Sequence, residues 1–452
     1  MMSIQEAALA LCADWSGGNP VFTGVSTDSR TLKQGDLFIA LSGEQFDGHR
    51  FISAAIERGA VAAMVSADAA IIPAKSGFGW IRVGDTRLGL GQLAAYWRRR
   101  FALPLIAVTG SNGKTTVKEM IAAIFRHVFG QESVLATTGN LNNDIGVPQM
   151  LLQLDARHVV AVIEMGMNHA GEIAYLSHLA APTIAVITNA GTAHIEHLVT
   201  TEAIARAKGE IFEGLEAKGV AVINADDSHA PLWRQFAGNR QVVDFGLETT
   251  AAISARLVDP SGDQWLLQLP DDKIEIALQV PGRHNVYNAL AAAAAAAATA
   301  AGIGINSIAE GLCSFKGVPG RLQKKTGLHQ SILIDDTYNA NPDSMQAALN
   351  VLAEMPGKKI LIMGDMGELG PDGAAFHYTI GQQAASSGID ILLALGESSR
   401  QAVAGFGRGA EHFSSLDSLL EKAKNCLDEH ASILVKGSRF MRMERVVEQL
   451  QA

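Results

Sequence analysis

The chain has 452 residues, 48% hydrophobic and 18% charged, which excludes a disordered protein and predicts two to four globular domains. Its formal net charge of -10 excludes a dominant electrostatic attraction to nucleic acid or to an anionic membrane. The three scattered cysteines, Cys12, Cys313 and Cys426, argue against a disulfide framework and suit small buried side chains in a reducing compartment.

Residues 1–18 lack the basic head of a signal peptide and carry Glu6 and Asp14, so we interpret them as an amphipathic helix. Apart from an alanine tract, no apolar run of about 20 residues is free of charge or glycine. We therefore expect a cytoplasmic protein without membrane insertion.

The first 101 residues alternate short strands with helices, which predicts a small N-terminal α/β domain. Strands are expected at 35–42 and 61–65, and helices at 48–58 and 88–101. The last helix ends in Arg98, Arg99 and Arg100. These arginines could form an anion site, but we favour complementation of the helix dipole.

Apolar strands follow at 103–109, 159–164, 184–188 and 220–224, with helices between them, including 114–129. This alternation is typical of a parallel sheet covered on both faces. Between 240 and 280 the pattern changes to alternating strands, which predicts an antiparallel addition.

Residues 289–301 are almost all alanine, which indicates a buried helix packed closely on the sheet. Its polar start, residues 281–288, is expected to face a site. From about 318 onward, strands at 331–335, 359–363, 389–395 and 432–436 alternate with helices in a doubly wound pattern.

The predicted fold class is α/β with three domains. A small N-terminal α/β domain spans 1–101. A central P-loop parallel-sheet ATPase-like domain spans 102–317, and a C-terminal Rossmann-like α/β domain spans 318–452.

A phosphate-binding loop is predicted at Thr109–Thr116 (TGSNGKTT), between an apolar strand and a helix. Backbone N–H groups and the helix dipole at such a turn attract phosphate, Lys114 adds a positive charge, and the Thr115 hydroxyl can ligate magnesium. The strict signature needs a glycine at position 108, which is Val108, so this is a shortened G-x-x-G-K-T form.

Two candidate metal ligands follow apolar strands at the same edge of the predicted sheet. Glu164 ends one strand and offers the oxygen ligands that magnesium prefers. His194 follows another, but a lone histidine is as often structural.

The predicted helix at 201–212 carries Arg206, Lys208 and Glu210, a pattern that periodicity alone assigns to a solvated charged face. The alternative is that a lysine near metal ions reacts as a neutral amine with carbon dioxide, giving an anionic carbamate that binds metal.

Ten segments together resemble the Mur ligases of bacterial cell-wall synthesis over essentially the whole chain. These segments are Ser26–Arg30, Leu41–His49, Thr109–Thr116, Gly139–Pro148, Glu164–Ile173, Ala207–Phe212, Pro281–Ala289, Asp335–Pro342, Gly364–Gly370 and Lys436–Arg439.

This resemblance implies an ATP-dependent amide ligase that works through an acyl phosphate, and implies that the protein is a monomer. Its substrates would be ATP with Mg²⁺, UDP-N-acetylmuramoyl-tripeptide and an amine. The family motif for diaminopimelate, Asp-Asn-Pro-Arg, is absent, and Tyr338–Pro342 (YNANP) with Gly364–Gly370 (GDMGELG) fits the member that takes D-alanyl-D-alanine.

The resemblance also implies residue roles. Lys114, Lys208 and His194 would be catalytic, and the metal would be held by Thr115, Glu164, His194 and a carbamylated Lys208. The ATP-binding residues would be Gly110, Ser111, Asn112, Gly113, Lys114, Thr115, Thr116, Asn285, Arg321, Asp336, Tyr338 and Asn339. The UDP-muramoyl-peptide would contact Ser26, Thr27, Asp28, Ser29, Arg30, Gln45, Phe46, His49, Asn140, Asn142 and Asn143.

Two alternatives stay open. One is a sibling amide ligase, such as a folylpolyglutamate synthase or a Mur ligase with another amine, although the STDSR and FDGH segments argue against a folate enzyme. The other is a regulator that uses ATP as a switch.

Overall fold

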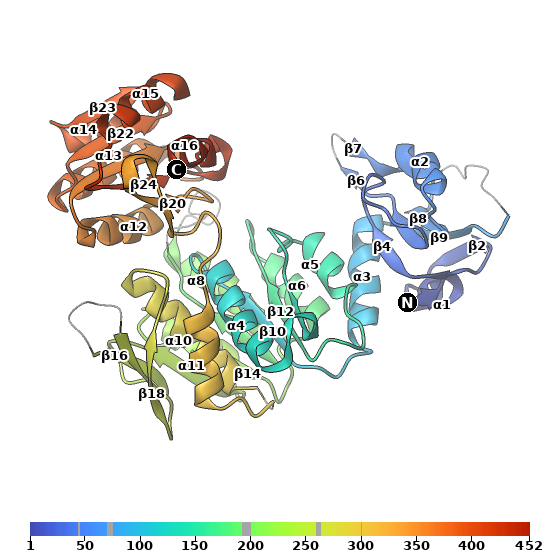
Figure 1. The fold of residues 1–452 in the computed structure, drawn as a ribbon. Helices are drawn as coiled ribbons and strands as arrows, with labels where there is room; N and C mark the ends of the chain where they lie inside the picture. Colours follow the sequence, from blue (N-terminus) through green and yellow to red (C-terminus); the bar gives the residue numbers. More distant parts are fainter. Residues whose placement is uncertain (44–45, 70–75, 192–199, 259–263, 300) are drawn as a thin grey trace.

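The computed structural model describes residues 1–43, 46–69, 76–191, 200–258, 264–299 and 301–452. Three α/β domains follow one another along the chain (Figure 1). The N-terminal and C-terminal domains lie on opposite sides of the central one. In the part of the chain that is described, no helix combines the length and apolar character needed to cross a membrane.

The N-terminal domain is built on a five-stranded sheet in which the edge strand β2 is antiparallel to its neighbour and the other pairs are parallel. In sheet order the strands are β2 (Asp14–Gly17), β9 (Gly79–Val83), β8 (Ala62–Ser66), β5 (Asp36–Ile39) and β4 (Gly24–Ser26). The helices are α1 (Ile4–Ala10), α2 (Ile52–Glu57) and α3 (Thr86–Arg98). Two-residue strands form small pairs, β1 (Met2–Ser3) with β3 (Val21–Phe22) and β6 (Ser42–Gly43) with β7 (Phe46–Asp47).

The predicted N-terminal helix is correct only as far as Ala10. Cys12 has a positive φ of 49° and turns the chain, after which β2 pairs with β9 more than sixty residues away. The turn leaves Cys12 exposed, while Cys313 and Cys426 are half-buried and all three are free thiols. The expectation of three buried cysteines is therefore wrong.

The end of α3 fastens the N-terminal domain to the central one. Trp97 donates its indole N–H to the carbonyl of Leu154, and Arg98, only 4% exposed, donates to the carbonyl of Ala180. Burial lowers the pKa of this guanidinium. Arg98 is thus a buried link between chain segments, which neither the dipole nor the anion interpretation anticipated.

The central domain contains a nine-stranded sheet whose first seven strands are parallel and whose last two are antiparallel additions. The antiparallel addition predicted for 240–280 is correct from residue 264 onward, whereas the two strands before it, within 241–257, continue the parallel sheet. In sheet order the strands are β11 (Val134–Ala136), β12 (Val160–Glu164), β10 (Leu105–Thr109), β13 (Ile184–Ile187), β14 (Val220–Asn224), β15 (Gln241–Gly246), β16 (Ile253–Leu257), β17 (Gln264–Gln268) and β18 (Lys273–Ala277). The chain order reverses at β10, and ligands bind at such a switch point, beyond the carboxyl ends of the strands.

Helices cover both faces of this sheet. Ile106 and Val108 of β10 pack with α4 (Lys114–Phe129), α10 (Arg283–Ala297) and α11 (Ile305–Ser314). Leu105 and Ala107 point to the other face, since side chains alternate along a strand. That face is covered by α3, α5 (Gly146–Leu151), α6 (Glu172–Ala180), α8 (Thr201–Gly209) and α9 (Ala230–Ala237).

The alanine tract forms the buried helix expected from the sequence. Ala289 through Ala296 are fully buried in α10. Small side chains allow helices to approach closely, and α11 shows the same requirement, because a Cβ added to Gly311 would lie 2.5 Å from the Cα of Ile124.

The C-terminal domain is the predicted doubly wound unit, parallel except for its edge strand β19. In sheet order the strands are β19 (Gln323–Thr326), β20 (Ile332–Asp336), β24 (Ala431–Lys436), β21 (Lys358–Gly364), β22 (Ile391–Leu395) and β23 (Ala410–Phe413). One face carries α12 (Pro342–Glu354), α13 (Gly373–Ser386) and α14 (Arg400–Phe406), and the other α15 (Leu416–Cys426) and α16 (Glu444–Leu450).

Candidate active site

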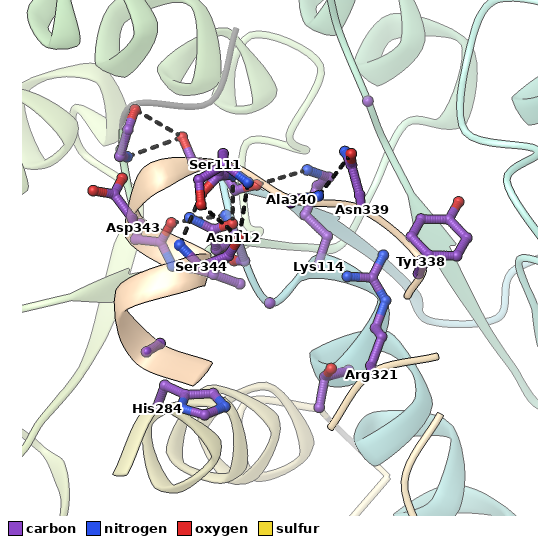
Figure 2. Close-up of a pocket in the computed structure, with 18 of the residues that line it drawn as sticks. Ser111, Asn112, Lys114, His284, Arg321, Tyr338, Asn339, Ala340, Asp343 and Ser344 are labelled. Carbon is purple, nitrogen blue, oxygen red and sulfur yellow. Dashed lines mark hydrogen bonds between the residues drawn. The ribbon is translucent and has the colours of Figure 1, made fainter. Parts of the chain in front are cut away.

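A cavity of about 1030 Å³ lies between the central and C-terminal domains. The central domain contributes the loops after β10, β12 and β13 and the start of α10, and the C-terminal domain contributes the ends of β20 and β24 and the start of α12. Figure 2 shows Lys114, Arg321 and Tyr338 on one side and the α12 residues Asp343 and Ser344 close to the loop residues Ser111 and Asn112. The cavity therefore brings together residues more than 200 positions apart.

The predicted phosphate loop lies at the end of β10 and leads directly into α4, which begins at Lys114. Gly110 and Gly113 have positive φ values of 151° and 83°. A Cβ would lie 1.8 Å from Thr188 Oγ1 at Gly110 and 2.3 Å from Asn288 Oδ1 at Gly113. Both positions therefore require glycine for conformation and for space.

Two residues after β13 hold this loop in place, and the sequence interpretation did not select either of them. Asn189 Oδ1 accepts from the Asn112 amide at 2.9 Å, and Thr188 Oγ1 donates to the Asn112 carbonyl at 2.6 Å. From the C-terminal domain, Asn341 donates to Asn112 Oδ1 at 2.9 Å. The loop is thus fixed from both domains.

We expect Gly113→Ala to weaken ADP binding by about 10-fold, or about 1.4 kcal/mol, because the new methyl group must displace Asn288 from the loop. Gly130→Ala, at the other end of α4, is the matched control. Gly130 has a similar φ of 87°, but nothing lies within 4 Å of its added Cβ. Both variants should also lose folding free energy, about 1–2 kcal/mol at Gly113 in the left-handed region and about 1–3 kcal/mol at Gly130, whose φ of 87° and ψ of 161° are essentially restricted to glycine. Calorimetric titration with ADP tests the difference, and equal affinities in the two variants would contradict the steric argument.

Lys114 folds back over its own loop. Its Nζ donates to the carbonyls of Gly110 at 2.7 Å and Ser111 at 3.2 Å. Desolvation lowers the pKa of this amine, while the nearby Glu164 carboxylate acts in the opposite direction. The side chain therefore already points into the loop where phosphate oxygens would be received.

Glu164 ends β12 and is only 3% exposed. Its Oε1 accepts from Asn142 Nδ2 at 2.8 Å, whereas its Oε2 is buried and has no hydrogen-bond partner among the described residues. A buried carboxylate oxygen without a partner is costly, so this atom suits a cation.

Lys208 lies on α8 and is 1% exposed, so the solvated-face interpretation is wrong for this residue. Burial, together with the positive charge of Lys114, holds the pKa of Lys208 well below its usual value. Its neighbour Arg206 does face solvent, where it pairs with Glu202 at 2.8 Å. The other candidate ligand, His194, lies outside the described residues.

Across the described ranges, no three histidine, cysteine, aspartate or glutamate side chains gather in a metal-binding group. The oxygen-bearing side chains that were predicted to bind a metal and that the structure describes here are therefore Glu164 and Thr115.

The C-terminal domain adds a cation and a buried ion pair to the cavity. The guanidinium of Arg321 lies 4.2 Å above the Tyr338 ring and donates to Thr115 Oγ1 at 3.2 Å. Lys436 Nζ donates to Asp336 Oδ2 at 2.6 Å and to the carbonyl of Asn339 at 2.9 Å. The Arg321 contact ties this domain to the start of α4, and the Lys436 contacts fix Asp336 and Asn339 within the C-terminal domain.

The start of α10 supplies polar groups, as its sequence predicts. Asn285 is buried and donates to the carbonyl of Pro281 at 2.7 Å. His284, which was not selected from the sequence, also lines the cavity, and burial lowers its pKa to about 4. Its imidazole is therefore neutral near pH 7.

The structure separates the predicted substrate residues into two groups. Asn140, Asn142 and Asn143 line the cavity, although Asn143 Oδ1 already accepts from the Gly146 amide at the start of α5. The N-terminal-domain residues do not line it. This second group comprises Ser26, Thr27, Asp28, Ser29, Arg30, Phe46 and His49; Gln45 lies outside the described residues.

Within that second group, Arg30 binds both carboxylate oxygens of Asp28 and lowers the pKa of Asp28 to about 2. Thr27 accepts from Gln149 of α5 at 2.6 Å, a contact between the N-terminal and central domains.

The aromatic and histidine side chains of this group are also engaged. His49 uses both ring nitrogens inside the domain, at Asp47 and at the Ser66 amide. The exposed Phe46 ring stacks on Phe51 with centroids 5.4 Å apart.

Three family models match the chain in order: "Mur ligase family, catalytic domain" over residues 21–98, "Mur ligase middle domain" over 108–296, and "Mur ligase, glutamate ligase domain" over 320–439. The UDP-N-acetylmuramoyl-tripeptide–D-alanyl-D-alanine ligase of Escherichia coli (strain K12) is 42% identical, covering 100% of this chain and 99% of that protein.

Two solved structures are also similar over nearly the full length. A crystal structure of MurF from Acinetobacter baumannii has a TM-score of 0.90 and 36% identity, covering 99% of this chain and 98% of that one. MurF from Thermotoga maritima in complex with ADP has a TM-score of 0.83 and 26% identity, covering 95% and 97%.

Proposed function

The chain belongs to the Mur ligase family, and on that premise we propose that it is an ATP-dependent ligase that adds D-alanyl-D-alanine to UDP-N-acetylmuramoyl-tripeptide. The products are the UDP-muramoyl-pentapeptide precursor of peptidoglycan, ADP and phosphate. The observation that carries the reaction chemistry is the cavity between two domains, which is lined both by the phosphate loop and by Glu164, whose Oε2 has no partner among the described residues. The identity of the two substrates is inferred from the relatives that match the chain over its full length.

ATP lies in this cavity with its phosphates on the loop, where backbone N–H groups and the amine of Lys114 bind oxygens. Arg321, Asp336, Tyr338 and Asn339 complete the nucleotide site from the C-terminal domain, and Asn285 contributes from α10. The similar structure of the Thermotoga maritima protein is a complex with ADP, which supports nucleotide use.

The donor set at this site fits Mg²⁺. Glu164 Oε2, the Thr115 hydroxyl and a carbamate on Lys208 are oxygen ligands, and His194 is the fourth candidate. When bound, the metal neutralises charge on the phosphate oxygens. The depressed pKa of Lys208 favours the neutral amine that reacts with carbon dioxide, which supports carbamylation of this residue.

In the first step the terminal carboxylate of the tripeptide attacks the γ-phosphorus of ATP. The new P–O bond gives an acyl phosphate, and the bond to the ADP oxygen breaks. Phosphoryl transfer depends on positioning and on charge stabilisation, which are the tasks of Lys114, the loop amides and Arg321.

In the second step the D-alanyl-D-alanine amine attacks the acyl carbon. The C–N bond forms, the acyl C–O bond to phosphate breaks, and the departing phosphate takes up the proton that the nitrogen loses. The C-terminal domain approaches the phosphate loop through Asn341 and Arg321, so its closure over the cavity excludes the water that would hydrolyse the acyl phosphate.

The UDP end of the substrate lies on the N-terminal domain, near Ser26–Arg30, Phe46 and His49. Asn140 and Asn142 hold the peptide end at the cavity. The Gln149–Thr27 contact joins these two regions, which supports one continuous substrate path. For the three domains we propose the limits expected from the sequence, 1–101, 102–317 and 318–452.

A phosphate-release assay over a panel of UDP-muramoyl-peptides and amines tests this function. We expect phosphate release only when ATP, a UDP-muramoyl-tripeptide and D-alanyl-D-alanine are all present, with a product mass that identifies both partners. A sibling ligase would require another acid or another amine. ATP hydrolysis that is indifferent to D-alanyl-D-alanine would favour a nucleotide-gated regulator and contradict the proposal.

A further inference from the structure

The Glu164 carboxylate is held by two neighbours that leave one oxygen free. The Asn142 side chain donates a hydrogen bond to Glu164 Oε1, and the Thr137 hydroxyl accepts one from the main-chain N–H of Glu164 at 2.9 Å. The other carboxylate oxygen, Glu164 Oε2, has no hydrogen-bond partner among the described residues. A carboxylate whose backbone and one oxygen are both fixed presents its other oxygen in a set direction, which is what a metal ligand requires.

Thr137 lies where the edge strand β11 separates from β12. The pairing continues through Ala136 and Val162, and the Thr137 amide still donates to the Val162 carbonyl at 3.0 Å. In a regular parallel ladder the next bond would run from the Glu164 N–H to the Thr137 carbonyl. Here the Thr137 hydroxyl takes that N–H instead, and the carbonyl is released for another donor.

That donor is Lys118, whose Nζ lies 2.7 Å from the Thr137 carbonyl. Lys118 is 1% exposed and also pairs with Glu119. It is located on α4 one turn beyond Lys114, so a single helix carries the phosphate-loop amine and the amine that draws the Thr137 carbonyl away from the ladder. The Lys118 ammonium is therefore shared between the Glu119 carboxylate and the Thr137 carbonyl, and a hydrogen bond from a charged donor is stronger than one from a neutral donor.

We propose that Lys118 is a positioning residue for the metal-binding carboxylate of Glu164, acting through Thr137. By holding the Thr137 carbonyl, Lys118 turns the Thr137 hydroxyl toward the Glu164 amide and so sets the direction of Oε2. The inference rests on the proposed function, because it assigns Glu164 to a metal ion.

Lys118→Met and Thr137→Val test the two links. The first removes the cation and keeps the apolar stem, and the second removes the hydroxyl at nearly constant volume. Lys118→Arg and Thr137→Ser are the conservative partners. Arg126→Met is the matched control, because Arg126 pairs with the same Glu119 on α4 at 3.2 Å, whereas the bond to the Thr137 carbonyl comes from Lys118.

Two affinities separate positioning from a general structural role. One is the affinity for ADP without metal, measured by calorimetry, which reports the phosphate loop. The other is the affinity for Mn²⁺ with ADP saturating, measured by electron paramagnetic resonance, which reports the metal ligands.

Lys118→Met and Thr137→Val should each weaken Mn²⁺ binding by about 10- to 100-fold, the usual effect of removing a group that orients a metal ligand. Their metal-free ADP affinity should change by less than about 2-fold, and Thr137→Ser and Arg126→Met should match the wild type. Lys118→Arg should restore part of the loss.

Unchanged Mn²⁺ affinity in Thr137→Val would overturn the inference. An equal loss of both affinities in the two variants would overturn it as well, because it would indicate a general structural role. Should Lys118→Met fail to fold, Lys118→Arg tests the first link, because it should still bind Mn²⁺ more weakly than the wild type, and the Thr137→Val and Thr137→Ser pair tests the second. Wild-type protein that binds ADP but no Mn²⁺ would instead overturn the metal assignment in the proposed function.

Discussion

A Lys114→Ala variant is expected to lose at least about 10³-fold in kcat/KM while its unfolding temperature stays close to that of the wild type. The amine now donates to the carbonyls of Gly110 and Ser111, where the triphosphate would replace those partners. Among the described side chains, Lys114 alone supplies a cation from within the loop at the N-terminus of α4, and charge stabilisation is the main task in phosphoryl transfer.

The free energy of unfolding should not decrease in Lys114→Ala, because the folded state disfavours the charged form of the Lys114 amine. Its pKa is lowered by desolvation, so the unfolded state binds the proton more tightly than the folded state. A group of this kind disfavours folding at pH values where the free amine is charged, and that penalty fades as pH rises toward the usual lysine pKa. Removing it therefore carries no electrostatic cost at neutral pH.

Arg206→Ala is the control for this experiment. Arg206 lies on α8 near the site but faces solvent and pairs with Glu202, so its loss should leave turnover unchanged. Steady-state phosphate release and circular dichroism melting on the three proteins check the prediction. Near-normal turnover in Lys114→Ala would contradict the whole assignment of the loop.

The phosphate loop and Glu164 could be predicted from sequence because their geometry is local. An apolar strand, a G-x-x-G-K-T loop and a helix are consecutive in the chain, so α4 begins where it was expected, at Lys114. The carboxyl end of an apolar strand also identifies the ligand edge of a parallel sheet, which is why Glu164 could be selected.

The residues that hold these groups could not be predicted, because their roles depend on distant pairing. Asn189 and Thr188 act on the loop only because β13 lies beside β10. The Thr137 hydroxyl accepts from the Glu164 N–H only because β11 ends at the preceding residue, Ala136. Asn341 reaches Asn112 only through the placement of the C-terminal domain. No local pattern carries that information.

Charged residues were misjudged for the same reason. Arg98 and Lys208 stand in helices with ordinary charge patterns, yet both are buried by elements far away in the chain. Arg98 meets the carbonyl of Ala180, and Lys208 lies on the face of α8 that packs into the central domain. Periodicity describes one helix face, whereas burial depends on what the tertiary structure places against it.

Among the described residues no carboxylate pairs with Lys208, and a buried lysine of this kind needs an explanation. The two causes of its depressed pKa are burial and the charge of Lys114, both of which disfavour the ammonium form. A carbamate would reverse the sign of the charge, which would then be attracted to Lys114 and to a metal ion. Modification therefore relieves the electrostatic conflict that the unmodified side chain creates.

Lys208→Ala is accordingly expected to lower kcat/KM by at least about 100-fold, since it removes an anionic metal ligand. Added acetate should restore part of the activity, because a small carboxylate can occupy the space and the charge of the missing carbamate. Lys114→Ala is the matched control and should gain nothing from acetate, because it lacks a cation rather than an anion. Activity over a series of acetate concentrations, with intact-protein mass measured at neutral pH, checks both points. A Lys208→Ala variant that keeps wild-type turnover, or that acetate rescues no better than Lys114→Ala, would contradict the assignment of a carbamate to Lys208.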